Sequence, residues 1–318
     1  MIVLYVLSAL LALYLIFIVG PATVAYFKIF GKRSASPLDD MDISKTYFAP
    51  YEKMMRAAAD ELKKLPSERI RIKAYDGIDL YADHINVGSD KTAVFFHGYK
   101  ATPEINFGVH AKSFIDHGYN VLLVYMRGHS VSGGENNTLG LIEQYDVLSW
   151  VNFLDKTDVK HIVLYGISMG ASTIAYASPH ITSRKVCAMV MDCGFISPAA
   201  QISRDCTIRK LPAPLLIPVI NAIFKKRFGL DLNEKTTDAL KYDAIPVLFL
   251  HGTSDLTVTY KDSQLNYDAC AADKKLILAE GLHHTLAFST CGSEVREQIF
   301  DFLEQHINNK QQGAEKNE

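Results

Sequence analysis

Short apolar runs alternate with helix-length segments over most of the chain. Six runs have the length and the continuous hydrophobicity of strands that are buried on both faces: 92–96, 120–125, 161–165, 186–191, 246–250 and 275–279. Helix-length segments follow or separate them, at 106–117, 139–154, 171–178, 261–271 and 293–306. This alternation is typical of βαβ units, so we predict a doubly wound α/β fold with a mostly parallel sheet and helices on both faces.

A hairpin and a helix are expected before the parallel strands. Polar and apolar residues alternate over 69–86 around Asp76-Gly77, which is a strong signal for two antiparallel strands joined by a tight turn. Before the hairpin, 31–44 has the composition of a linker and 51–64 that of a charged helix. We therefore assign 28–68 to a linker and helical lead-in and 69–307 to the folded domain. The polar tail 308–318 is expected to be disordered.

One connection is far longer than a βα loop requires. It runs from 195 to 242, between two predicted strands, and it indicates an inserted helical lid. Within it, 211–228 is strongly apolar and ends with Lys225, Lys226 and Arg227. We favour packing of its apolar face on the domain, with the basic residues in solvent. The alternative is that it covers an acyl pocket or contacts a bilayer.

The first 27 residues contain no charged side chain. Nearly all of 2–19 is aliphatic or aromatic, which is long enough to cross a bilayer, so we predict that 1–27 is a transmembrane anchor. A cleaved signal peptide would have a basic start and a shorter apolar core, although 23–25 resembles a cleavage site. Lys28, Lys32 and Arg33 follow the span and no basic residue precedes it, which places the main domain in the cytoplasm.

Composition excludes some classes of function. The net charge of −2 and the pI near 6.6 supply no field that would recruit nucleic acid. The cysteines are odd in number and lack the spacing of a zinc site, so we expect no metal and interpret them as buried thiols in a reducing compartment. Their positions are 187, 193, 206, 270 and 291.

The segment 161–170, HIVLYGISMG, joins a buried strand to a helix through GxSxG. This pattern is typical of a nucleophile elbow, in which a serine occupies a strained turn between strand and helix. Side chains two residues away on either side would collide in such a turn, and Gly166 and Gly170 avoid the collision. Ser168 is therefore the candidate nucleophile.

A serine hydroxyl needs a base and an acid, and both follow in the chain. The strand in 246–255, PVLFLHGTSD, ends in a loop that presents Asp255, and the strand in 275–284 ends in a loop that presents His283 and His284. Asp192, at the end of an earlier strand, is an alternative acid, but Asp255 lies in the expected loop between the serine and the histidines. One histidine of the pair is expected to act as the base.

An oxyanion hole needs two backbone donors. The expected donors are Met169, which follows the nucleophile, and Tyr99, in the loop after the first parallel strand. His97 lies in the same loop and is interpreted as a residue that orders the turn by hydrogen bonding.

The segments HGYK, MRGHSVSGG, GISMG, MDCGF, HGTSD and GLHH together resemble the α/β-hydrolase superfamily. The resemblance covers about 69–307 and is greatest to membrane-anchored bacterial members that are grouped with serine aminopeptidase-like and monoacylglycerol lipase-like hydrolases. It implies Ser168 as nucleophile, Asp255 as acid, and His284 rather than His283 as base. It also implies Tyr99 and Met169 as oxyanion donors.

The chain departs from the family pattern at three places, none in the candidate triad. Met126 stands where many relatives have aspartate, Ser130 replaces a common glycine, and 285–288 lacks a frequent run of small residues.

The resemblance implies hydrolysis through an acyl-enzyme without a cofactor, and leaves the substrate open. Our first hypothesis is a serine hydrolase that cleaves carboxylic esters, with hydrophobic acyl or lipid-like substrates. A peptidase or amidase would need polar lid residues that hold a peptide terminus, for which Asp205, Asp231 and Glu234 are candidates. A catalytically silent binding protein on the same fold is the third hypothesis. We expect an anchored, membrane-bound protein that binds no nucleic acid, with the oligomeric state open.

Overall fold

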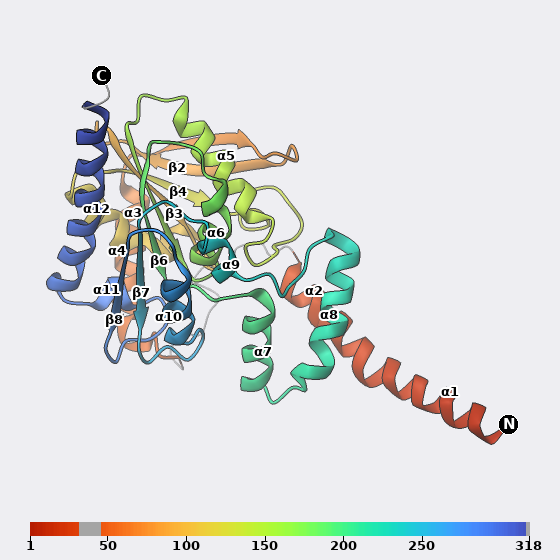
Figure 1. Ribbon diagram of the computed structural model, residues 1–318. Coiled ribbons are helices and arrows are strands. Elements are labelled where there is room, and N and C mark those ends of the chain that lie inside the picture. Colours follow the sequence, from red (N-terminus) through yellow and green to blue (C-terminus); the bar gives the residue numbers. More distant parts are fainter. Residues whose placement is uncertain (32–45, 316–318) are drawn as a thin grey trace. The chain divides into compact units, whose positions relative to one another are not determined.

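The computed structural model describes residues 1–31 and 46–315, which form two compact units (Figure 1). One unit joins Met1–Gly31 to Ser197–Glu234, and the other holds the rest of the described chain. After the expectations from the sequence, we call the first the cap–anchor unit and the second the hydrolase unit. Most of the predicted linker, with Lys32 and Arg33, lies outside the described residues.

An eight-stranded sheet forms the centre of the hydrolase unit. Its order is β1-β2-β4-β3-β5-β6-β7-β8. Strands β3 to β8 are parallel neighbours, whereas β2 is antiparallel to both β1 and β4. The strands span Glu68–Lys73 (β1), Asp79–Ile85 (β2), Lys91–Phe96 (β3), Asn120–Tyr125 (β4), His161–Ile167 (β5), Val186–Asp192 (β6), Val247–Gly252 (β7) and Lys274–Ala279 (β8). The predicted hairpin and mostly parallel sheet are both confirmed.

Helices cover both faces of this sheet (Figure 1). On one face, alternate strand residues such as Phe95 and Tyr165 pack with Phe107, Phe114 and Phe288 from the covering helices. The helices α3, α4, α11 and α12 lie on that face, and α5, α6 and α10 lie on the other. The helices of this unit span Glu52–Lys64 (α3), Pro103–Asp116 (α4), Glu143–Asp155 (α5), Met169–Ala177 (α6), Thr236–Leu240 (α9), Tyr260–Ala269 (α10), Ala287–Thr290 (α11) and Ser293–Glu315 (α12). Short 3₁₀ turns lie at Ala49–Tyr51 and Ser178–His180.

Two predicted boundaries differ from the structure. Helix α5 begins at Glu143 rather than 139, because the Glu143 carboxylate accepts hydrogen bonds from the N–H and hydroxyl of Thr138 and from the N–H of Gly140, which fold the preceding residues into turns. Helix α12 continues to Glu315, so the expectation of a disordered tail from 308 was wrong for 308–315. The Lys310 ammonium donates to backbone carbonyls of Arg184 and Val186, which holds this end of the helix against the start of β6.

The cap–anchor unit consists of the N-terminal helix and most of the predicted lid. The N-terminal helix comprises α1 (Ile2–Tyr14), a π-helical turn (Leu15–Val19) and α2 (Gly20–Phe30). It is the one helix among the described residues that is long and apolar enough to cross a membrane, a property that cleaved signal sequences share. The lid contributes α7 (Pro198–Ile208) and α8 (Ala213–Phe228). The last part of the predicted insertion, α9, packs with α6 and α10 of the hydrolase unit.

Candidate active site

Ser168 occupies a sharp turn between β5 and α6. Its backbone has φ 53° and ψ −112°, a conformation that a residue with a side chain rarely adopts. A Cβ at Gly166 would lie 2.5 Å from the Ala171 nitrogen, and a Cβ at Gly170 would lie 1.9 Å from the Phe96 oxygen. Both distances are far below van der Waals contact, so the turn can form only with glycine at these two positions.

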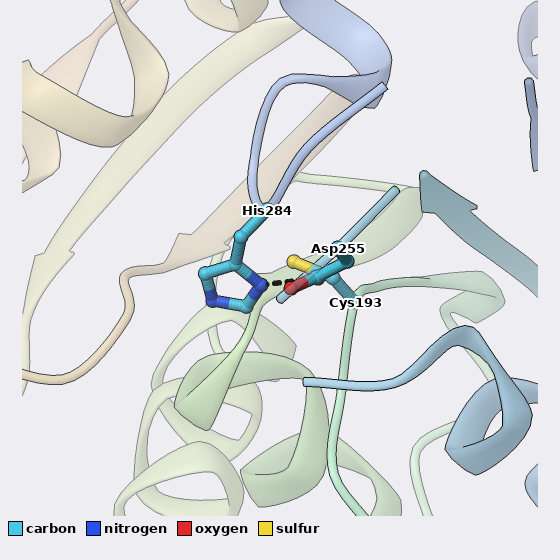
Figure 2. A group of neighbouring side chains, drawn as sticks. All are labelled: Cys193, Asp255 and His284. Carbon is cyan, nitrogen blue, oxygen red and sulfur yellow. Dashed lines mark hydrogen bonds and ion pairs between the residues drawn. The ribbon is translucent and has the colours of Figure 1, made fainter. Parts of the chain in front are cut away.

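Three predicted side chains from different loops meet at this turn. The Ser168 Oγ lies 3.0 Å from His284 Nε2, and His284 Nδ1 lies 2.5 Å from Asp255 Oδ2. Figure 2 shows the imidazole of His284 directed at the Asp255 carboxylate. The loops converge because β5, β7 and β8 are parallel and end at the same edge of the sheet. The arrangement has the geometry of a nucleophile, a base and an orienting acid.

The Asp255 carboxylate is fully buried and accepts several hydrogen bonds. Its Oδ1 accepts the backbone N–H groups of Thr257 at 2.8 Å and Val258 at 2.9 Å. Its Oδ2 contacts both His284 and His251. Burial opposes ionisation, but these histidines outweigh it and hold the pKa of Asp255 well below its usual range. Asp255 is therefore an anion, as an orienting acid must be.

His251 is a residue of the site that our sequence reasoning missed. It is fully buried at the end of β7, and its Nε2 lies 3.0 Å from both Asp255 Oδ2 and the Val258 carbonyl oxygen. Its Nδ1 lies 2.7 Å from the Ser263 hydroxyl. Since the two neighbours of Nε2 are acceptors only, Nε2 carries the proton and Nδ1 accepts from Ser263. The signal was a histidine four residues before Asp255 on a buried strand.

The other predicted histidine, His283, faces a different set of atoms. Its Nδ1 donates to the Ser254 carbonyl at 2.8 Å, and its ring stacks on Tyr47 at 5.0 Å between centroids. The Tyr47 hydroxyl lies 3.4 Å from the Thr257 hydroxyl in the Asp255 loop. His283 therefore helps to hold the two loops together, and His284 is the histidine that reaches the serine.

Asp192, the alternative acid, makes no contact of this kind. Its Oδ2 accepts a hydrogen bond from the Tyr165 hydroxyl at 3.1 Å, and its backbone oxygen accepts from the Ser168 N–H at 2.8 Å. Burial raises the pKa of Asp192 to about 7. Asp192 thus braces the turn at Ser168 through its backbone, whereas Asp255 is hydrogen-bonded to His284.

Cys193 lies beside the pair, as Figure 2 shows, and its sulfur, an Asp255 oxygen and a His284 nitrogen lie within 4.8 Å of one another. This spacing is compatible with a metal site. However, Asp255 and His284 are hydrogen-bonded to each other at 2.5 Å, and burial raises the pKa of the Cys193 thiol well above its usual value. A metal would require a thiolate and a free imidazole nitrogen, so the residues fit a hydrogen-bonded pair beside a neutral thiol better than a metal centre.

The predicted oxyanion donors lie in the segments that flank Ser168. Met169 is the first residue of α6, and Tyr99 follows Gly98 in the loop after β3. That loop passes close to the nucleophile, because a Cβ on Gly98 would lie 3.5 Å from the Ser168 Cβ. The Gly98 N–H itself donates to Asn106 at 2.8 Å. The backbone N–H groups of Tyr99 and Met169 stay our prediction for the oxyanion hole.

Two neutral histidines order this loop. His97 Nδ1 donates to the Gly98 carbonyl at 2.8 Å, and its Nε2 accepts from the Met126 N–H at 3.1 Å. Burial lowers the pKa of His97 to about 3, so the ring is uncharged. His129 Nε2 accepts from the Lys100 N–H at 3.2 Å on the other side of the loop. His97 thus makes hydrogen bonds within the loop after β3, as the sequence analysis expected.

The close approach at Gly170 predicts a large loss of stability on substitution. Gly170→Ala puts a methyl group against the Phe96 carbonyl, so we expect a loss of about 3 kcal/mol or more in the free energy of unfolding, measured by urea denaturation. Gly292→Ala is the matched control, since a Cβ there meets nothing within 4 Å. Equal stability of the two variants would contradict the assigned geometry.

The raised pKa of Asp192 predicts a pH-dependent stability difference. Between pH 4 and 7 the unfolded carboxyl ionises while the folded one stays protonated, so the wild type loses stability as pH rises. Asp192→Asn removes this loss, and its unfolding free energy relative to the wild type should rise over that range by roughly 3–4 kcal/mol. Urea denaturation at pH 4, 5.5, 7 and 8 measures it, with the exposed Asp268→Asn as control. A difference that does not change with pH would refute the assignment.

Comparisons with known proteins agree with this architecture. A family profile described as "alpha/beta hydrolase fold" matches residues 92–206. The uncharacterized protein YqkD of Bacillus subtilis is 29% identical over 197 residues, which cover 60% of this chain and 64% of YqkD, less than two thirds of that relative.

Solved structures share the fold. The Pyrococcus furiosus esterase Pf2001 aligns with a TM-score of 0.63 and 22% identity over 78% of this chain and 93% of its own. Est1E of Butyrivibrio proteoclasticus, solved with ferulic acid bound, aligns with a TM-score of 0.58 and 19% identity over 75% and 99%. With the sheet order and the turn at Ser168, these likenesses show that the chain has the α/β-hydrolase fold.

Proposed function

We propose that the protein is a membrane-anchored serine esterase whose catalytic triad is Ser168, His284 and Asp255. The observation that carries the proposal is the continuous path of hydrogen bonds from the Ser168 hydroxyl through His284 to the buried Asp255 carboxylate. The superfamily and its esterase structures support hydrolysis as the reaction class.

In this mechanism His284 accepts the proton of Ser168 as the serine oxygen attacks the ester carbonyl carbon. Asp255 keeps the His284 proton on Nδ1, which leaves Nε2 free to act as the base, and its charge stabilises the imidazolium that forms. The N–H groups of Tyr99 and Met169 stabilise the oxyanion of the tetrahedral intermediate. The imidazolium then protonates the leaving alcohol, and water, activated by the same histidine, releases the acid from the acyl-enzyme.

The proposed substrates are esters with hydrophobic acyl or lipid-like groups. The apolar composition of the predicted lid segment 211–228 supports this. The apolar N-terminal helix supports a location at a membrane. By the positive-inside rule, the basic residues Lys28, Lys32 and Arg33 support a cytoplasmic hydrolase unit, which a reporter fused to the C-terminus would test.

The polar cap residues do not favour the peptidase alternative. Asp231 is paired with Lys225 at 2.6 Å and accepts from Asn221 and its own turn. The Glu234 carboxylate accepts from the Asp231 N–H, and Asp205 accepts from a glutamine one turn earlier on α7. These carboxylates therefore have structural partners within the cap, and ester hydrolysis remains the leading proposal.

Ser168→Ala should abolish covalent labelling by a fluorophosphonate probe, which reacts only with an activated serine. His284→Ala should reduce labelling strongly, and turnover of p-nitrophenyl esters should fall by about 10⁴-fold or more in both variants. Ser149→Ala, on the surface of α5, is the control that should label like the wild type. Turnover of p-nitrophenyl esters with increasing acyl chain length then measures which chain lengths the protein accepts. If the folded wild type neither reacts with the probe nor hydrolyses any ester, the hypothesis of a catalytically silent binding protein replaces this proposal.

His251→Leu should lower kcat by roughly 10–100-fold with little change in KM, since it removes a charge-assisted hydrogen bond to Asp255. His251→Gln keeps an amide N–H donor in reach of the Asp255 carboxylate and should restore part of the lost kcat. Ser263→Ala, which leaves the Asp255 contact intact, is the control and should have a smaller effect. A stable His251→Leu variant with unchanged kcat would show that His251 has no positioning role.

A further inference from the structure

The N-terminal helix of the cap–anchor unit has two parts with different surroundings. From Ile2 to Phe17 its large apolar side chains are exposed on every side, with Phe17 itself 65% exposed. From Ala22 onward one stripe is buried, at Ala22, Tyr26 and Phe30. A helix that is apolar all round belongs in a bilayer, whereas a helix with one buried stripe packs against protein. The same helix therefore changes its environment near residue 20.

The partner of the buried stripe is the cap helix α8. The ring of Phe30 lies 4.9 Å from that of Phe224 near the end of α8. The π-helical turn Leu15–Val19 also contacts α8, although it lies more than two turns before Phe30. Because Phe224 is near the C-terminal end of α8 and packs on Phe30, the contacts with the π-helical turn are assigned to the earlier part of α8.

Length places the membrane boundary close to the start of α8. At 1.5 Å per residue, a helix needs about 20 residues to cross a hydrocarbon core of about 30 Å. The stretch that is exposed on every side ends at Phe17 and packing on the cap begins at Ala22, so we place the boundary between these two residues. The first turn of α8 and the connection before it thus lie at the level of the bilayer surface.

The surface at this level has the chemistry of a membrane interface. Ile208 is 61% exposed, Leu211 47% and Leu215 54%, and they cluster at the connection between α7 and α8. The exposed basic residues Arg209 and Lys210 lie between them. Exposed apolar side chains next to basic ones are typical of segments that enter the boundary between headgroups and acyl chains. We call residues 208–215 the cap tip.

We propose that the cap tip inserts into the headgroup–acyl boundary of the bilayer that holds the anchor, with Ile208, Leu211 and Leu215 among the acyl chains and Arg209 and Lys210 at the phosphates. The observations that carry this are the packing of α8 on the N-terminal helix and the exposed apolar side chains beside it. The inference rests on the anchored part of the proposed function and is independent of the hydrolytic part.

Tryptophan fluorescence in brominated lipid tests the proposal with the full chain. The chain has one tryptophan, Trp150, which is fully buried in the hydrolase unit and supplies a constant background. Leu211→Trp and Leu215→Trp each place a second tryptophan at the cap tip. Two separate variants are used so that local misfolding of one of them does not decide the result. Phe17→Trp reports on the anchor, and Lys226→Trp, on the exposed end of the same helix α8, is the matched control. The variants are compared in nanodiscs of phosphatidylcholine with and without acyl-chain bromine.

Bromine should quench the added fluorescence of both cap-tip variants and of Phe17→Trp by at least twofold, and leave that of Lys226→Trp unchanged. Quenching of Phe17→Trp with both cap-tip variants unquenched would overturn the proposal while keeping the anchor. An unquenched Phe17→Trp would overturn the anchor and the proposal together. Because the readout is spectroscopic, loss of esterase activity in any assay leaves this result unaffected, so the two proposals fail separately.

Discussion

The contact between the first turn of α6 and the Phe96 carbonyl at the end of β3 is the constraint on which the site depends. It brings the helix so close to the neighbouring strand that no Cβ fits at Gly170, and it forces Ser168 into an unfavourable backbone conformation. The cost is met by the surrounding structure, in which the Ser168 N–H bonds to Asp192 and α6 is buried along its length. The result is a turn that presents the Ser168 hydroxyl to His284.

A second constraint is the burial of an ionised carboxylate. Removing Asp255 from water would protonate it unless several donors replaced the lost hydration. Two backbone N–H groups and two histidines supply these donors, and the loop that carries them is anchored through His251 to Ser263 on α10. The same network of hydrogen bonds therefore stabilises the charge of Asp255 and orients His284.

The cap and the N-terminal helix form a common unit, although six of the eight strands of the sheet lie between them in the sequence. Aromatic packing of Phe30 on Phe224 joins them. Our preference for packing of the apolar cap segment on the domain took no account of the anchor as a partner. In the structure Phe224 packs on the N-terminal helix, whereas Ile208, Leu211 and Leu215 are exposed. Packing therefore accounts for one part of the cap, and the membrane contact that we propose concerns another.

The sequence by itself determined the sheet, the nucleophile turn and the order of Ser168, Asp255 and His284, because hydrophobic periodicity and glycine spacing are local properties. Hydrophobic pattern failed where particular side-chain hydrogen bonds, near or distant in the chain, decided where a helix begins or ends. The end of α12 is polar, yet Lys310 finds carbonyls at the start of β6, and α5 starts late because Glu143 binds the turn before it. The resemblance already favoured His284 over His283, whereas the contacts of His251 and the pairing of cap with anchor required tertiary structure. His251 is close to Asp255 in the chain, but its place in the network depends also on Ser263 of another element, and Phe30 and Phe224 are far apart in sequence. A pattern of neighbouring residues carries no information about atoms that only folding brings together.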